Sequence, residues 1–127
     1  MKAADTNVVV RLLMRDDDAQ TKAAEAFVAR GAWVSLLVLL EACWVMASTY
    51  KLRRAELGTA VGMLLQHDRL VLEQPMLVAS ALQQFQSRGG AEFADCLILE
   101  AARAAGNLPL GTFDRRLAAV PGAELLG

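Results

Sequence analysis

The sequence predicts an α/β domain in which helices cover both faces of a short parallel sheet, as a three-layer α/β/α sandwich. Short apolar segments alternate with longer segments of helical periodicity. Polar residues or glycines separate these segments. The 127 residues, 55% of them hydrophobic, suffice for one domain with its own core, so we predict a single domain over residues 1–127.

The amino-acid composition excludes few classes of function. With 13 basic and 14 acidic residues the net charge is −1, so any nucleic-acid binding must depend on local Arg or Lys clusters. Cys43 and Cys96 each stand alone in an apolar segment, which favours small core residues over zinc ligands or a disulfide. No charged and apolar leader is recognisable, so the cytoplasm is the expected location.

The polar triplet Asp5-Thr6-Asn7 lies between apolar runs and marks a strand that turns into a helix. We predict a strand over 3–5 and a helix over 7–15, although Val8-Val9-Val10 favours a strand by propensity. After the acidic turn 16–18, the sequence predicts an amphipathic helix over 19–29, which ends at Gly31.

The central segment from Ala32 to Tyr50 is almost unbroken apolar sequence. A membrane span is disfavoured because Glu41 at its middle would cost roughly 2.5–3.5 kcal/mol on insertion. Ser35 instead resembles a helix cap that separates a strand over 32–34 from a long helix to about Tyr50. Leucine spacing predicts a further helix over 53–66.

The remaining elements continue the alternation. Their expected ranges are a strand over 70–72, a helix over 76–87 after Pro75, a helix over 93–105, a strand over 108–111, a short helix opened by Asp114 and an edge strand over 124–126. Gly89-Gly90 is expected to stop the helix that begins after Pro75.

Most of the fourteen acids have structural explanations in turns or on exposed helix faces; Glu100 is among the latter. Glu41 is different, because a buried unpaired carboxylate costs several kcal/mol unless a cation or a proton compensates it. The alternative places Glu41 on the one exposed edge of its helix. Taken singly, Asp5, Asp95 and Asp114 are explained as caps or as favourable charges at helix N-termini.

Taken together, the acids Asp5, Glu41, Asp95 and Asp114 indicate a metal site. Each lies near a strand end or in the first turns of a helix, and such positions can converge at one edge of a parallel sheet. Clustered carboxylates repel one another unless a divalent cation compensates them. Oxygen ligands without His or Cys suit Mg²⁺ or Mn²⁺, and such a metal activates water for hydrolysis of a phosphodiester.

Other reaction types lack their residues. The chain has neither a Gly-x-x-x-x-Gly-Lys phosphate loop nor a Gly-x-Ser-x-Gly elbow. The single histidine, His67, cannot form the acid/base pair of a two-histidine ribonuclease and is expected at the surface.

The order and spacing of these motifs resemble the PIN-domain nucleases. The matching segments are Asp5-Thr6-Asn7, Ser35 with Glu41, Phe93-Ala94-Asp95 and Thr112-Phe113-Asp114-Arg115. Within that family, the length, Arg11-Leu12-Leu13 and Asp16-Asp17-Asp18 resemble the VapC toxins of type II toxin–antitoxin systems.

The resemblance implies a PIN-like fold and a Mg²⁺- or Mn²⁺-dependent ribonuclease. It implies that Asp5 and Asp95 bind metal, that Glu41 and Asp114 complete the acidic cluster, with Asp114 a further metal ligand, and that Asn7 and Thr112 orient these carboxylates. It also implies a homodimer silenced by a VapB-like antitoxin, whose C-terminal tail covers the acids.

Some residues depart from the family pattern or have two explanations. Ala3-Ala4 is a thin first strand, and Gly111 stands where an apolar residue is usual. Glu92 is either an outer acid of the site or only a helix cap. Four arginines are candidate RNA-phosphate contacts, with a solvated surface as the alternative: Arg11, Arg15, Arg115 and Arg116.

Three other functions compete with the nuclease. A PIN module that has lost catalysis and only binds RNA or protein is disfavoured because all four acids are present. A response-regulator receiver domain needs a Lys after a late strand, whereas the lysines here are Lys2, Lys22 and Lys51. A haloacid-dehalogenase-like phosphatase needs a second Asp where Asn7 stands.

Overall fold

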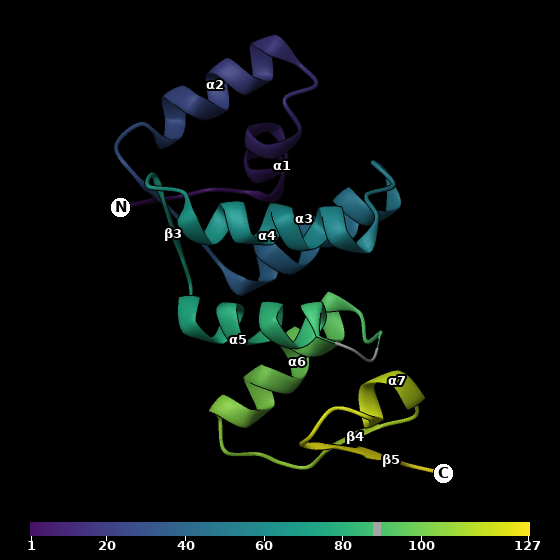
Figure 1. Ribbon diagram of the computed structural model, residues 1–127. Helices are drawn as coiled ribbons and strands as arrows, with labels where there is room; N and C mark the ends of the chain where they lie inside the picture. The colour runs from purple at the N-terminus through teal and green to yellow at the C-terminus, as the bar shows by residue number, and fades with distance from the viewer. Residues whose placement is uncertain (88–89) are drawn as a thin grey trace. The chain divides into compact units, whose positions relative to one another are not determined.

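The computed structural model describes residues 1–87 and 90–127 (Figure 1). Its contacts divide the chain into two compact units, Met1–Pro75 and Met76–Gly127, which are described separately below. Both contain helices and parallel strands, so the predicted class, an α/β fold around a short parallel sheet, is confirmed.

The first unit contains a three-stranded parallel sheet. Its strands are β1 (Lys2–Ala3), β2 (Ala32–Val34) and β3 (Leu70–Leu72), and they are arranged in that order. Lys2 pairs with Ala32, which in turn pairs with Leu70. Because the strands are parallel, the residues that follow them, including Asp5 and Ser35, belong to one edge of the sheet.

Four helices belong to the first unit: α1 (Thr6–Met14), α2 (Asp18–Val28), α3 (Leu36–Ser48) and α4 (Arg54–Gln66). The triple valine is helical, against its strand propensity. Asp5 caps this helix, and Val9 and Val10 are almost fully buried as α1 packs against α2 and α3. Tertiary packing therefore outweighs the propensity of β-branched residues here.

Two acceptors hold the first turn of α3. Ser35 accepts a hydrogen bond from the Val38 N–H, as predicted for a cap, and Glu73 at the end of β3 accepts one from the Leu36 N–H at 2.8 Å. The apolar segment 32–50 is thus a strand followed by a capped helix. Among the residues that the structure describes, no helix is long and apolar enough to cross a membrane.

The described part of the second unit has three helices and a two-stranded parallel sheet of its own. Helix α5 (Pro75–Gln86) begins at the boundary and is followed by α6 (Phe93–Ala104), β4 (Leu110–Thr112), α7 (Arg115–Ala118) and β5 (Ala123–Leu125). Phe85 of α5 packs edge-on against Phe93 of α6, with ring centroids 5.7 Å apart. Gly89 of the predicted Gly89-Gly90 stop lies outside the described residues.

Gly111 of β4 has a packing role. A Cβ atom at this position would lie 3.0 Å from Cδ1 of Leu126, closer than ordinary contact allows. The glycine therefore makes room for the leucine that follows β5, whose N–H donates to the Thr112 carbonyl at 2.8 Å. The missing side chain at position 111 thus suits the close approach of residue 126.

The prediction that Glu100 lies on an exposed helix face is wrong. Glu100 is only 7% exposed, and its carboxylate accepts a hydrogen bond from Nε of Arg103 at 3.1 Å. Nη2 of Arg103 also donates to the Pro121 carbonyl, beside Gly122, where a Cβ atom would lie 2.8 Å from Nη2. Arg103 thus links the buried carboxylate of Glu100 on α6 to the turn that precedes β5.

Candidate functional site

Asp5 and Glu41 are both hydrogen-bonded to Thr6. The Thr6 N–H donates to Oδ1 of Asp5 at 2.8 Å, and the Thr6 hydroxyl donates to Oε1 of Glu41. Thr6 is buried in the first turn of α1, whereas both carboxylates are exposed. Glu41 therefore lies on the exposed side of α3, which is the second of the two interpretations of its position. Thr6 links two predicted site acids that lie 36 positions apart in the sequence, from Asp5 to Glu41.

The second unit gathers three carboxyl groups around the start of α6. Partial burial is the main cause that raises the pKa of Asp95 above its ordinary value, and the charges of Asp114 and Glu92 raise it further. Glu92 occupies the cap position of α6, but its side chain makes no capping hydrogen bond. Glu92 thus takes the cap position without capping through its side chain, and its charge lies close enough to Asp95 to affect that pKa. A nearby cation would relieve this repulsion.

Asp114 caps α7 through one carboxylate oxygen, so its other oxygen can bind a second partner such as a cation. Its Oδ1 accepts hydrogen bonds from the N–H groups of Arg116 at 2.8 Å and Leu117 at 3.3 Å. The Thr112 hydroxyl accepts one from the Asp114 N–H at 3.0 Å and so fixes the turn that presents the carboxylate. Because the caps made by Asp5 and Asp114 both use Oδ1, Oδ2 of each carboxylate can serve a cation.

The four predicted acids thus form two pairs, one in each unit. Within either unit taken by itself, the described residues contain no group of three or more His, Cys, Asp or Glu side chains that could hold a metal ion. Asn7, predicted to orient the acids, is exposed in the first turn of α1.

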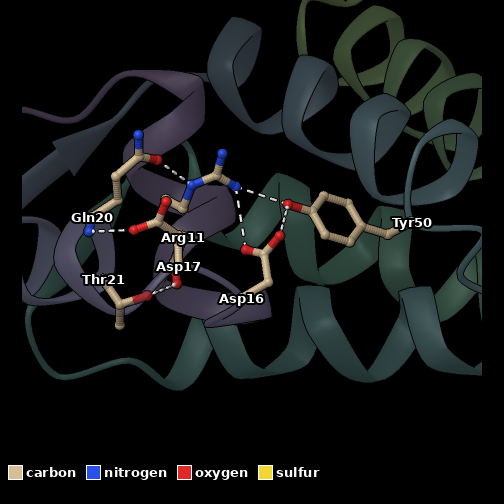
Figure 2. Close-up of polar contacts among 6 residues, drawn as sticks. All are labelled: Arg11, Asp16, Asp17, Gln20, Thr21 and Tyr50. Atoms are coloured by element: carbon tan, nitrogen blue, oxygen red, sulfur yellow. Dashed lines mark hydrogen bonds and ion pairs between the residues drawn. The ribbon is translucent and has the colours of Figure 1, made fainter.

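Arg11 belongs to a polar network that sequence reasoning missed (Figure 2). Its guanidinium donates to the side chains of Gln20 and Tyr50 and forms an ion pair with Asp16 at 3.4 Å. The Tyr50 hydroxyl donates to the other oxygen of Asp16 at 2.8 Å, which holds the pKa of Asp16 below its ordinary value and raises the pKa of Tyr50. The network joins α1, the start of α2 and the residues after α3.

The other three candidate arginines are exposed. Arg15 ends α1 and forms an ion pair with Glu25 at 3.2 Å. Helix α1 has nine residues, so Arg15 lies roughly 14 Å along the helix from its cap Asp5. Arg115 and Arg116 lie in α7, directly after Asp114. Of the four, these two are adjacent in sequence to a predicted site acid.

The remaining residues singled out in the sequence have structural positions. Cys43 and Cys96 are buried, as expected for small core residues, and burial raises the pKa of the Cys43 thiol to about 12. His67 is half-buried after α4, where its Nδ1 accepts a hydrogen bond from the Arg69 N–H at 3.1 Å.

Comparison with protein families identifies one match. The family described as "PIN domain" matches residues 3–123, which include all four predicted acids. No curated protein and no solved structure matched the chain.

Proposed function

This chain belongs to the PIN domain family, and we propose that it is a Mg²⁺- or Mn²⁺-dependent endoribonuclease. A PIN domain implies a nuclease-type fold. The observation that carries the proposal is the presence of two acidic pairs. Asp5 and Glu41 both accept hydrogen bonds from Thr6, and Asp95 lies close enough to Asp114 for its charge to raise the pKa of Asp95. Helix capping alone does not explain both pairs. Like charges at the second pair cost electrostatic energy, and a bound cation would offset that cost.

The donor atoms fit a hard divalent cation. All are carboxylate oxygens, and Asp5, Asp95 and Asp114 are the proposed metal ligands. When bound, the cation supplies a water of lowered pKa and polarises the phosphoryl oxygen. Glu41, whose Oε1 accepts a hydrogen bond from the Thr6 hydroxyl, is the residue proposed to orient such a water and accept its proton.

RNA recognition is assigned to the basic residues nearest the acids. Arg115 and Arg116 follow Asp114 and are exposed, so they are the proposed contacts to phosphates next to the cleaved bond. Arg11 is engaged by Asp16 and Tyr50, and Arg15 lies at the far end of α1, so either would contact RNA away from that bond.

The biological role proposed is that of a VapC-type toxin in the cytoplasm. It rests on the resemblance of Arg11-Leu12-Leu13 and Asp16-Asp17-Asp18 to such toxins. The proposed partners are a second copy of the chain and a VapB-like antitoxin whose tail offers a basic side chain to the acids. A short open reading frame for a DNA-binding protein directly upstream, whose product suppresses the cleavage, would support this pairing.

The decisive experiment compares two capping aspartates. Asp5→Asn keeps a side-chain oxygen that can cap α1 but removes the charge that binds the cation. RNA cleavage by purified protein with Mg²⁺ should fall by more than the roughly 10–100-fold expected for an outer-shell change. Asp95→Asn should lose activity to the same extent.

Asp17→Asn is the matched control. Asp17 caps α2 by accepting from the Gln20 N–H at 2.9 Å and has no proposed role in the metal site. Its variant should cleave RNA at the wild-type rate. Equal rates for Asp5→Asn and Asp17→Asn, or wild-type cleavage that persists in EDTA, would overturn the proposal. Wild-type protein that binds RNA without cutting it would instead favour a non-catalytic PIN module.

A further inference from the structure

The first unit contains a pocket at the edge of its sheet opposite to Asp5. It has a volume of about 250 Å³, and its apolar lining comes from Leu12 of α1 and from Val28 and Ala29 at the end of α2. The pocket also includes Arg69, whose carbonyl accepts from the Ala32 N–H where β2 begins. Asp5 follows the other end of β1, so this pocket is separate from the Asp5–Glu41 pair.

Two guanidinium groups give the pocket its charge. Nη1 of Arg69 donates to the Ala29 carbonyl at 3.1 Å, which fixes this side chain against the end of α2. Arg15 is held from the other side by its 3.2 Å ion pair with Glu25. Each guanidinium carries five N–H donors, so both retain donors for a ligand. With Glu25 as the single acid among the lining residues, cationic charge is in excess.

His67 adds a further hydrogen-bond donor to the lining. Its Nδ1 accepts a hydrogen bond from the Arg69 N–H, and in the neutral imidazole this assigns the ring proton to Nε2. The hydrogen bond therefore couples His67 to the same residue that supplies one of the guanidinium groups. Donors thus come from three lining side chains, Arg15, Arg69 and His67.

We propose that this pocket binds a small phosphomonoester, with the phosphate against Arg15 and Arg69 and a short apolar group on Leu12 and Val28. A phosphomonoester carries about −1.5 to −2 charges at pH 7 and three strong acceptor oxygens, which match two guanidinium forks and one imidazole N–H. The volume lies just below the roughly 300–1,000 Å³ of drug-sized sites, which favours a small ligand over a polymer. This inference does not depend on the nuclease activity.

The proposal predicts opposite changes in ligand affinity for the loss of Glu25 and the loss of Arg69. Its carboxylate occupies Arg15, so it competes with an incoming phosphate for the same guanidinium. Removing the charge of Glu25 should therefore tighten ligand binding, whereas removing that of Arg69 should weaken it. A surface that attracts anions only by general charge would not distinguish these residues from their exposed neighbours.

The test is a titration of the full-length protein, followed by NMR chemical shifts, with phenyl phosphate, inorganic phosphate and benzoate as probes. Phenyl phosphate should bind more tightly than either of the others, because only it combines the dianion with an apolar group. Arg69→Gln should weaken its binding about tenfold, and Glu25→Gln should tighten it about two- to fivefold. Arg15→Gln provides a second loss variant if Arg69→Gln fails to fold.

Matched controls separate the pocket from general charge. Arg30→Gln removes an exposed charge next to Ala29, outside the pocket lining, and Asp18→Asn removes one at the other end of α2. Both should leave the affinity for phenyl phosphate unchanged. The proposal fails if Arg30→Gln weakens binding as much as Arg69→Gln, if benzoate or inorganic phosphate binds as tightly as phenyl phosphate, or if only an RNA oligonucleotide binds.

Discussion

The two acidic pairs are held in opposite ways by the units that carry them. In the first unit, Thr6 donates one hydrogen bond to Asp5 and another to Glu41, so both carboxylates have a partner without any cation. In the second unit, Asp95 is partly buried and faces two like charges, Asp114 and Glu92. The first pair is positioned by hydrogen bonds, whereas in the second the charge of Asp95 is disfavoured by partial burial and, to a smaller extent, by like charges. A cation would therefore change the energetics of the second pair more than those of the first.

After the loss of a proposed metal ligand, the largest effect is expected from breaking the link in the first pair. Thr6→Val keeps the shape of a buried side chain but removes the hydroxyl that orients Glu41. The cleavage rate at saturating Mg²⁺ should fall by about 10–100-fold, as for other residues that orient site groups. The Mg²⁺ concentration for half-maximal activity should change little, because the proposed metal ligands remain.

Two threonine variants control this experiment. Thr6→Ser restores the hydroxyl and should recover most of the rate. Thr21→Val changes another buried threonine, whose hydroxyl donates to the Arg11 carbonyl at 3.5 Å, and should cleave RNA normally. If Thr6→Val and Thr21→Val had the same rate, the bond from Thr6 to Glu41 would have no part in cleavage.

A smaller effect, of opposite sign, is expected for the stability of the second unit without metal. The raised pKa of Asp95 means that its ionised form destabilises the folded state at neutral pH. Asp95→Asn should therefore raise the Tm in EDTA by roughly 1–3 °C, a modest change because solvent screens a half-exposed group. The gain should shrink as the pH falls through the raised pKa towards the ordinary value of 3.8, because wild-type Asp95 is then protonated.

Thermal melts of wild type, Asp95→Asn and Glu124→Gln across this pH range provide the measurement. Glu124 is an exposed acid of β5 in the same unit, so its variant controls for the change in net charge. Added Mg²⁺ should stabilise wild type and not Asp95→Asn. A lower Tm for Asp95→Asn at neutral pH would show that the repulsion inferred around Asp95 is absent.

The smallest effect is expected in the network of Figure 2. Tyr50→Phe removes the hydroxyl that donates to Asp16 and accepts from Arg11. The Tm should fall by about 1 °C or less, because Asp16 is exposed and its two partners are only half-buried, and cleavage should not change. Since Tyr50 lowers the pKa of Asp16, the stability difference should be present at neutral pH and vanish as Asp16 is protonated. A large loss of cleavage would assign this network to the site.

Much of the fold followed from local signals. Caps at Asp5, Ser35 and Asp114, together with alternating apolar segments, predicted nearly every helix and strand to within two residues. Pairing between distant strands has no such signal. The sequence therefore did not predict that β4 and β5 form a sheet apart from β1, β2 and β3.

The candidate acids could be selected from the sequence because each lies where its type is unusual or caps a helix. Their partners could not, because a hydrogen bond between Thr6 and Glu41 depends on how α1 packs against α3. The burial of Glu100 and the pocket that includes Arg69 depend on similar long-range packing. Threonine, glutamate and arginine are common at such sequence positions. Their roles depend on which residues lie next to them in the folded chain.

The hydrogen bond from the Leu36 N–H to Glu73 has a consequence for mutational scans. Because Glu73 helps to hold the start of the helix that carries Glu41, its loss should disturb that helix without removing any metal ligand. An alanine scan of acidic positions would therefore count Glu73 as a false fifth member of the site. Glu73→Gln keeps an amide oxygen that can accept this hydrogen bond, so normal cleavage by that variant would show that Glu73 has only a structural role.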